Sequence, residues 1–223
     1  VYGGVYNDKP VTFGYSEQIQ SFAGIFSDWY GDTALEFDPV KFNADEIVAL
    51  AKEAGMRSIV ITTKHHDGFC MFKTATTDYN SVDATPSKRD YVKELSDACR
   101  RGDINFAIYF SLIDWHFPHA YPISSHNCDF ITPQHHEFTK AQVTELLTNY
   151  GPVSELWFDM GSNRPEQSKE LYELVHKLQP NCMVSGRLGN GWYDFAVMAD
   201  NKYPEGALQA PWQSAASMFD ETW

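Results

Sequence analysis

The stretch Leu156-Trp157-Phe158-Asp159-Met160-Gly161 decides which fold the sequence predicts. It follows a turn at Gly151-Pro152, and the short apolar run at 154–158 is typical of a buried strand. Because that strand ends in a carboxylate, Asp159 is expected at the carboxyl edge of a sheet, where parallel α/β folds gather their catalytic groups. The alternative is a structural role, since aspartate is also common in turns and as a helix cap.

Segments with helical and strand patterns alternate along the rest of the chain. Helices are predicted at 16–22, 43–54, 91–101, 133–150 and 165–178. Strands are predicted at 58–62, 105–111, 154–159, 183–185 and 195–199. This alternation, with short turns and no hairpin signal, favours a parallel sheet covered by helices. The first 39 residues are the least regular; Asn7-Asp8 is a turn signal there, and no strand is expected at the start.

Two helices carry a specific prediction of which side faces inward. In the helix at 43–54, Asn43 is the expected N-cap. Its expected apolar face is Ile47, Leu50, Ala51 and Ala54. In the helix at 133–150, the expected apolar set is Phe138, Ala141, Val143, Leu146 and Leu147.

Polar side chains follow one predicted strand after another. They are His65-His66-Asp67, Asp114-Trp115-His116, Asp159, Arg187 and Asp200. Titratable groups at successive strand ends are typical of a (β/α)8 TIM-like barrel, whose site lies at its C-terminal face. A doubly wound sheet has less support, because the chain has no GxGxxG motif.

Composition excludes some classes of partner. The 223 residues carry a net charge of −13, which disfavours binding to nucleic acid. No stretch is long and apolar enough to suggest a membrane span. Aromatic residues make up 15% of the chain, which is consistent with a carbohydrate site and also with a large core.

The adjacent histidines allow two functional interpretations. His65, His66 and Asp67 could bind a metal ion, as in a metal-dependent hydrolase, but neighbouring side chains diverge on extended backbone and no HExxH spacing is present. Two neutral imidazoles that exchange hydrogen bonds with sugar hydroxyls suit the pattern better. A hydrogen-bonded structural loop is the third alternative. Neither a GxSxG nor a Walker A motif occurs.

A retaining glycosidase needs a nucleophilic carboxylate and an acid/base carboxyl about 5–5.5 Å apart. Asp159 is the strongest candidate for the nucleophile. Glu205, on a loop beyond a predicted strand, is the first candidate for the acid/base. Glu17 and Glu221 are its rivals, and each of the three could instead be an ordinary surface carboxylate.

An ordered series of motifs resembles the retaining α-L-fucosidases of glycoside hydrolase family 29. The first is the stretch 61–69, ITTKHHDGF, which resembles the family's TTKHHDGF signature. The resemblance continues through 77–80, 89–95, 109–116, 148–152 and 156–159, and covers roughly 37–223. It implies a (β/α)8-like catalytic domain that releases α-linked L-fucose from glycans through a fucosyl-aspartate intermediate.

The resemblance also implies roles for individual residues. Asp159 matches the nucleophile in the family's WFD motif. The residues implied to bind or surround fucose are His65, His66, Tyr109, Trp157 and Arg187, with Glu17 near the sugar. An arginine beside a carboxylate favours its ionised form, and aromatic rings suit the methyl group of fucose. No metal or organic cofactor is implied.

Two features leave alternatives open within the resemblance. The position of the acid/base varies in the family, and Glu205 fits one subgroup. Where many relatives have Trp-Glu, this chain has Trp212-Gln213, which removes a carboxylate. A fucose-binding relative with impaired catalysis is therefore the alternative function. The expected partner is a fucosylated oligosaccharide or glycoconjugate, without nucleic acid or membrane, and the oligomeric state is left open.

The resemblance predicts that the chain is part of a longer protein. Family members begin with a strand that ends in an HWG motif, and they continue past the position of Trp223 to complete the barrel and commonly add a β-sandwich domain. Residues 1–223 are thus expected to form part of a catalytic barrel domain truncated at both ends, and to be unstable or inactive alone. Access to glycans predicts a periplasmic, secreted or lysosomal location.

Overall fold

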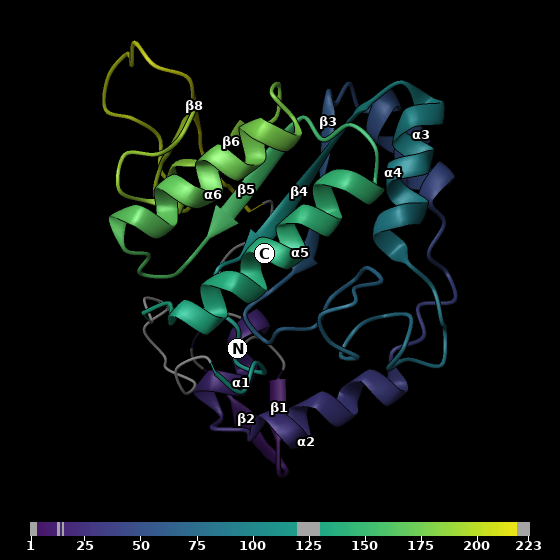
Figure 1. Ribbon diagram of the computed structural model, residues 1–223. Coiled ribbons are helices and arrows are strands. Elements are labelled where there is room, and N and C mark those ends of the chain that lie inside the picture. Colours follow the sequence, from purple (N-terminus) through teal and green to yellow (C-terminus); the bar gives the residue numbers. More distant parts are fainter. Residues whose placement is uncertain (1–3, 13, 15, 120–129, 218–223) are drawn as a thin grey trace.

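The computed structural model describes residues 4–12, 14, 16–119 and 130–217 (Figure 1). In chain order, the strands are β1 (Gly4–Tyr6), β2 (Lys9–Val11), β3 (Ser58–Lys64), β4 (Asn105–Ser111), β5 (Glu155–Asp159), β6 (Met183–Val184), β7 (Ala196–Val197) and β8 (Trp212–Gln213). The α-helices are α1 (Ile19–Phe22), α2 (Ser27–Gly31), α3 (Ala44–Glu53), α4 (Tyr91–Gly102), α5 (Pro133–Asn149) and α6 (Pro165–Leu178). Three short 3₁₀ helices are η1 (Ser16–Gln18), η2 (Asp32–Glu36) and η3 (Gly186–Leu188).

The centre of the molecule is a four-stranded parallel sheet in the order β3-β4-β5-β6. Each strand lies beside the next one in the chain, and a helix connects each of the pairs β3–β4, β4–β5 and β5–β6. In this register Tyr109 lies opposite Trp157, and Ser111 lies opposite Asp159. The predicted parallel α/β sheet is therefore confirmed, and it brings the ends of β4 and β5 to the same edge.

Side chains of the central strands point alternately into the hydrophobic core and towards the opposite face of the sheet. Ile108, Phe110, Leu156 and Phe158 have no exposed surface and belong to the hydrophobic core, which includes apolar residues of α4, α5 and α6. The intervening residues point to the opposite face of the sheet, because side chains alternate along a strand. In Figure 1, α5 and α6 lie across the face of the sheet that is turned to the viewer. The opposite face is left for the polar site.

The helix α3 begins where the sequence predicted but faces inward with a different set of residues. The Asn43 side chain accepts a hydrogen bond from the backbone N–H of Glu46, which confirms the N-cap. Of the predicted apolar face only Ala51 is confirmed as buried: it packs inward with Ala44 and Val48, whereas Leu50 is 68% exposed. Ala54 is exposed as well, and Ile47 is 38% exposed. Small residues at the contact let α3 approach α4, where Gly102 lies against Val48.

The long helix α5 packs through a partly polar face. Val143, Leu146 and Leu147 are buried as predicted and Phe138 is partly buried, but Ala141 is exposed. Four polar side chains share the buried face: His135, His136, Thr139 and Gln142. The Gln142 amide donates to Thr76 Oγ1 at 3.0 Å, so part of this face holds the loop that follows β3. A mixed face of this kind weakens the apolar period from which a helix is recognised in sequence.

A small hairpin lies near the start of the chain, where no strand was expected. β1 and β2 pair antiparallel around Asn7 and Asp8, whose φ angles are +50° and +59°. Two consecutive residues with positive φ are the requirement of a type I′ hairpin turn, so the turn signal was correct and its strands were missed. Strands of three residues are too short to show an alternating pattern.

Beyond β6 the chain continues around the sheet in short pieces. Ser185 forms an isolated parallel bridge with Phe195, and β7 pairs with β8 in a separate two-stranded sheet. The four-stranded sheet does not by itself establish a closed barrel, so the barrel and its truncation stay predictions, as does the β-sandwich domain. Among the described residues, no helix has the length and apolarity needed to cross a membrane.

Candidate functional site

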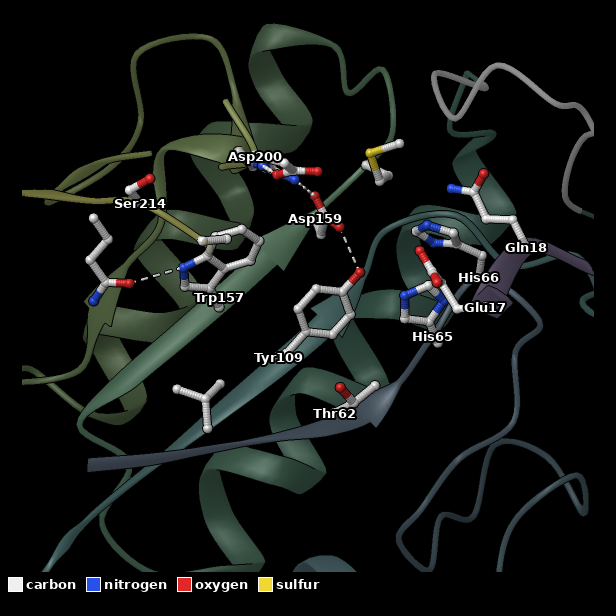
Figure 2. A pocket seen from close by; sticks show the side chains of 15 residues that line it. Glu17, Gln18, Thr62, His65, His66, Tyr109, Trp157, Asp159, Asp200 and Ser214 are labelled. Carbon is white, nitrogen blue, oxygen red and sulfur yellow. Dashed lines mark hydrogen bonds and ion pairs between the residues drawn. The ribbon is translucent and has the colours of Figure 1, made fainter. Parts of the chain in front are cut away.

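A pocket of about 580 Å³ lies on the face of the sheet away from α5 and α6, towards the carboxyl ends of the strands (Figure 2). Its lining includes every residue that the sequence assigned to substrate binding: Glu17, His65, His66, Tyr109, Trp157 and Arg187. Asp159 lines the same pocket, as do Asp200 and Gln213. Segments far apart in the sequence thus converge as predicted.

Asp159 ends β5 and is held by two donors. Tyr109 Oη donates to Asp159 Oδ2 at 2.6 Å, and Arg187 Nη1 donates to Oδ1 at 2.9 Å. The chain turns sharply after the aspartate, because Met160 has φ +53° and Gly161 has φ +129°. A Cβ on Gly161 would lie 2.9 Å from Leu112 Cβ, so this turn requires glycine on two counts. The carboxylate is therefore fixed at the pocket wall by its neighbours on both oxygens.

Arg187 joins Asp159 to a second carboxylate. Its Nη2 binds Asp200 Oδ1, while the guanidinium lies 4.8 Å from the centre of the Trp157 ring. The Trp157 ring in turn stacks against Tyr109 with a centroid separation of 5.8 Å. Burial lowers the pKa of Arg187, but the hydrogen bonds to Asp159 and Asp200 outweigh it and raise the pKa overall. One cation on an aromatic platform thus spans two carboxylates, an arrangement that fixes both in direction.

The two histidines form an uncharged wall beside Tyr109. The His65 ring stacks on Tyr109 at 5.4 Å with an interplanar angle of 7°, and the His65 and His66 centroids are 4.0 Å apart. Burial lowers the pKa of His65 to about 4 and holds that of His66 well below its usual range. Lys64 and the neighbouring histidine lower the pKa of His66 further. Both imidazoles are therefore neutral near pH 7 and can exchange hydrogen bonds with hydroxyl groups.

A buried ion pair supports the histidine loop from beneath. Lys64 Nζ lies 3.1 Å from Asp114 Oδ2, and both side chains are almost fully buried. Asp114 Oδ1 accepts hydrogen bonds from the backbone N–H groups of His116 and Phe117. Gly68 has φ +82°, and a Cβ there would lie 2.2 Å from Asp114 Oδ1, so the close approach of the two loops depends on glycine. Asp67 is half-buried near this pair, and the burial of its carboxyl group raises its pKa to about 6.

The three acid/base candidates of the sequence analysis have different positions. Glu17 lines the pocket, and burial raises its pKa, with a further increase from the charges of Asp200 and Asp159. Glu205 is exposed on the loop between β7 and β8 and does not line the pocket. Glu221 lies outside the described residues. The sequence analysis listed Asp200 among the polar residues at strand ends but not among the acid/base candidates. Its place directly after the predicted strand at 195–199 is the signal that could have added it to them.

Gln213 uses its amide group within the pocket wall. Its Oε1 accepts from Trp157 Nε1 at 3.1 Å, and its Nε2 donates to Glu155 Oε2 at 2.7 Å. An amide matches these two partners, because it offers one acceptor and one donor where a carboxylate would offer two acceptors. The residue that kept the non-catalytic alternative open thus has a structural role in holding Trp157.

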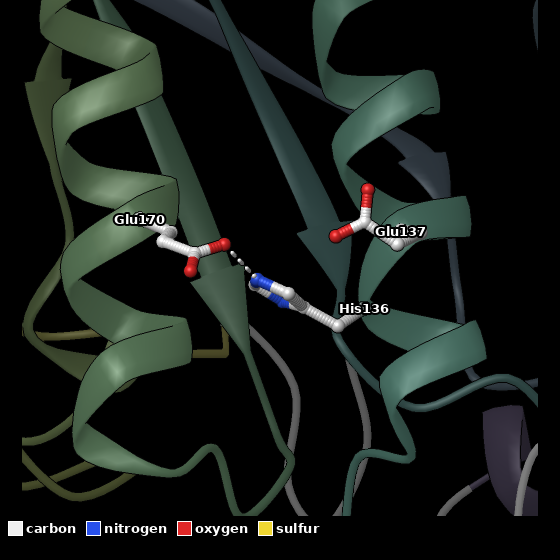
Figure 3. A group of neighbouring side chains, drawn as sticks. All are labelled: His136, Glu137 and Glu170. Carbon is white, nitrogen blue, oxygen red and sulfur yellow. Dashed lines mark hydrogen bonds and ion pairs between the residues drawn. The ribbon is translucent and has the colours of Figure 1, made fainter.

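The described residues do not gather His65, His66 and Asp67 into a metal-binding cluster. Among all the residues that the structure describes, the one group of three potential metal ligands is His136, Glu137 and Glu170, on α5 and α6 (Figure 3). His136 Nε2 lies 3.0 Å from Glu170 Oε2. Lys140 Nζ already lies 2.8 Å from Glu137 Oε1 and 3.1 Å from Glu170 Oε2, so a protein cation balances these carboxylates. The cluster is explained as a surface ion-pair network that joins the two helices.

Comparison with known proteins gives a consistent set of relatives. The family model for α-L-fucosidase matches residues 11–223. Plasma α-L-fucosidase of Homo sapiens is 34% identical over 209 residues, which cover 87% of this chain and 44% of that protein. α-L-Fucosidase 1 of Arabidopsis thaliana is 34% identical over 161 residues, or 69% of this chain and 30% of that protein. The chain therefore spans less than half the length of these curated relatives.

Solved structures agree in the arrangement of the backbone. The α-L-fucosidase AlfC from Lactobacillus casei in complex with α-L-fucose product superposes with a TM-score of 0.82 at 36% identity, covering 92% of this chain and 69% of that one. An α-L-fucosidase from Vibrio sp. strain EJY3 gives a TM-score of 0.85 at 35% identity, covering 95% and 40% of the two chains.

Proposed function

The chain belongs to the α-L-fucosidase family, and we propose that its pocket hydrolyses terminal α-linked L-fucose from glycans with retention of configuration. The observation that carries this proposal is the pair of carboxylates, Asp159 and Asp200, on one guanidinium at the carboxyl edge of a parallel sheet. Retaining glycosidases need two closely spaced carboxyl groups, and two carboxylates that share one arginine meet that need.

In this proposal Asp159 is the nucleophile. Its oxygen attacks the anomeric carbon of fucose as the bond from that carbon to the leaving oxygen breaks, and an acid protonates the leaving oxygen. This gives a fucosyl-aspartate. A water molecule, deprotonated by the same acid/base group, then attacks the anomeric carbon and releases fucose. Tyr109 and Arg187 support the role, because they hold both oxygens of Asp159 and so orient the attacking carboxylate.

Asp200 is the acid/base that we favour. It lies beyond the strand β7 and lines the same pocket as Asp159. Glu17, which lines the pocket and whose pKa is raised by burial, would instead accept a hydrogen bond from a sugar hydroxyl. Glu205 is the candidate that the sequence favoured; its exposure and its absence from the pocket lining count against it in this arrangement.

His65 and His66 are proposed to bind hydroxyl groups of the sugar, and the Trp157 and Tyr109 rings to contact its apolar surface. The catalytic domain is proposed to be a (β/α)8-like barrel of which the parallel sheet is a part. The human relative is named a plasma enzyme. For this chain we propose a periplasmic, secreted or lysosomal location, where glycans are accessible, and a fucosylated oligosaccharide or glycoconjugate as substrate.

The test is kinetics of the protein at its native length on an aryl α-L-fucoside and on a natural fucosylated oligosaccharide. Asp200→Asn is expected to slow the natural substrate by about 10²–10⁴-fold, the usual contribution of general acid catalysis. The aryl substrate should be less affected in the first step, because its leaving group needs little protonation. Added azide should then restore turnover and give the α-configured fucosyl azide, since it intercepts the fucosyl-enzyme.

Glu17→Gln and Glu205→Gln are the matched variants in the same assays. Azide rescue in either of them, and not in Asp200→Asn, would transfer the acid/base role to that residue. A wild-type protein that binds fucose but turns over neither substrate would establish the non-catalytic alternative. One that neither binds nor turns over a fucoside would refute the proposed function.

A further inference from the structure

A buried serine lies directly behind His66. Ser111 is the last residue of β4 and has no exposed surface. Its Oγ is 2.7 Å from His66 Nδ1 and 2.9 Å from the backbone carbonyl oxygen of Ile113. Three polar atoms thus form a short chain that ends on a carbonyl group.

The protons of this chain can be assigned from the donor and acceptor capacity of each group. A carbonyl oxygen can only accept, so the Ser111 hydroxyl must donate its single proton to Ile113. Ser111 Oγ is then left as an acceptor towards His66, and the proton of that second hydrogen bond must be on His66 Nδ1. The alternative, in which Ser111 donates to His66, would leave the buried carbonyl contact without a proton.

This assignment also determines whether the other ring nitrogen of His66, Nε2, carries a proton. The imidazole is neutral because burial holds its pKa well below the usual range. A neutral imidazole with its proton on Nδ1 carries a lone pair on Nε2. His66 lines the pocket and its Nδ1 is bound to Ser111, so Nε2 is the ring nitrogen that we expect a ligand to meet.

We propose that Ser111 is a positioning residue that fixes His66 as the Nδ1–H tautomer, so that Nε2 accepts a hydrogen bond from one hydroxyl group of the bound sugar. The inference rests on the proposed function for the identity of that sugar. It also sets the direction of one hydrogen bond in the pocket: a hydroxyl group of the sugar must donate to His66 Nε2. A deoxy sugar lacking that hydroxyl, or its methyl ether, would leave a buried acceptor unpaired and bind poorly.

The position of Ser111 ties this wall of the pocket to the nucleophile. Ser111 lies opposite Asp159 in the parallel register of β4 and β5. The next residue, Leu112, donates its backbone N–H to the carbonyl oxygen of Asp159 at 2.7 Å. The serine that orients the histidine and the strand that carries the carboxylate are thus held in one ladder, which fixes the sugar hydroxyl relative to the attacking oxygen.

The tautomer is tested by NMR of the full protein labelled with ¹⁵N in histidine, at neutral pH. The wild type is expected to show His66 with a protonated Nδ1 and an unprotonated Nε2. Ser111→Ala should lose the Nδ1–H signature, and Ser111→Thr, which keeps the hydroxyl, should restore it. The control is Thr63→Val, which removes another buried hydroxyl-to-carbonyl bond, from Thr63 Oγ1 to Tyr109, without touching His66. It should leave the tautomer unchanged.

Kinetics on a set of monodeoxy aryl fucosides supply the second readout. Ser111→Ala is expected to lower kcat/KM by about tenfold to a hundredfold on the parent substrate. For one deoxy substrate the loss should be much smaller, because the hydroxyl that His66 binds is already absent. Comparing each variant with the wild type on the same substrate cancels differences in intrinsic reactivity.

An Nε2–H tautomer in the wild type would overturn the inference, and so would an unchanged Nδ1–H tautomer in Ser111→Ala. Equal losses on every deoxy substrate would show that Ser111 acts only through stability. If no fucoside is turned over, the proposed function fails, while the NMR result still decides whether Ser111 sets the tautomer.

Discussion

The two sides of the pocket handle burial in opposite ways. On one side His65 and His66 have lost their charge, because burial lowers the pKa of each imidazole. On the other side the carboxyl groups of Asp159 and Asp200 are both bound by the guanidinium of Arg187. The comparison separates two tasks. Neutral imidazoles can bind sugar hydroxyls, whereas the arginine-bound cluster holds the two carboxyl groups that we propose for catalysis.

The neutral histidine side of the pocket is supported by a charged pair, Lys64 and Asp114, which is buried behind it. Lys64 directly precedes the histidines and would raise the cost of any positive charge there. Its own charge is balanced by Asp114, buried behind the loop. The same lysine therefore adds to the burial that lowers the pKa of His66, and it anchors the backbone that presents the imidazole. This predicts that the two sides respond differently when a charge is removed.

The largest effect is expected from Asp114→Asn. The amide keeps the oxygen that caps His116 and Phe117 but leaves the Lys64 ammonium buried and unpaired. Breaking a buried pair in this way costs about 3–5 kcal/mol in the free energy of unfolding, measured by urea denaturation. The double variant Lys64→Met/Asp114→Asn removes both charges and should recover most of the loss. No recovery would mean that the ion pair does not support the neutral side.

The charged side is tested by Arg187→Lys. A lysine keeps the positive charge but cannot bind two carboxylates with two fixed nitrogens or stack its head group flat on Trp157. We expect kcat/KM on an aryl fucoside to fall by about 10²–10³-fold, the range for losing one oriented donor in an active site. Stability in urea should change little by comparison. A variant within threefold of wild type would show that charge alone, without geometry, serves this side.

The smallest effect concerns pH. The pKa of Asp67 is raised to about 6, so between about pH 4 and 6 the folded protein holds a proton that the unfolded chain has lost, and stability falls as pH rises. His65 has the opposite slope, because its pKa is lowered to about 4 and the unfolded chain binds the extra proton. Asp67→Asn removes the contribution of Asp67 and leaves that of His65.

Asp67→Asn should therefore make stability rise more steeply between pH 4 and 6, and should stabilise the protein at pH 7 by about 1–2 kcal/mol after allowance for partial exposure. Urea denaturation at several pH values measures both quantities. If the free energy of unfolding depends on pH identically in the variant and the wild type, the pKa of Asp67 is not raised in the folded protein.

The sequence was a good guide wherever structure depends on local pattern. The strand 105–111 and the helix 165–178 appear with the predicted bounds, and Asn43 caps α3. Asp159 could be placed at a sheet edge, because a short apolar run before an aspartate is visible in one dimension. The histidine loop was recognisable for the same reason, as an uninterrupted motif.

What the sequence could not provide are contacts between distant segments. Leu50 looks like a core residue in an amphipathic helix, yet the close contact of α3 with α4 selects its alanine side. Asp200 and Gln213 each lie more than 40 residues from Asp159, and their roles come from pairing with Arg187 and Trp157. Ser111 is one serine among several until the structure places it between His66 and the Ile113 carbonyl.

The proposed role of Asp159 as the nucleophile is tested by trapping the covalent intermediate. The protein at its native length is incubated with 2-deoxy-2-fluoro-L-fucosyl fluoride, whose 2-fluorine slows release of the sugar, and then digested for peptide mass spectrometry. We expect one fluorofucosyl group per protein, attached to Asp159. A label on another carboxylate, Asp200 or Glu17 in particular, or an unlabelled protein that releases fucose with inverted configuration, would contradict it.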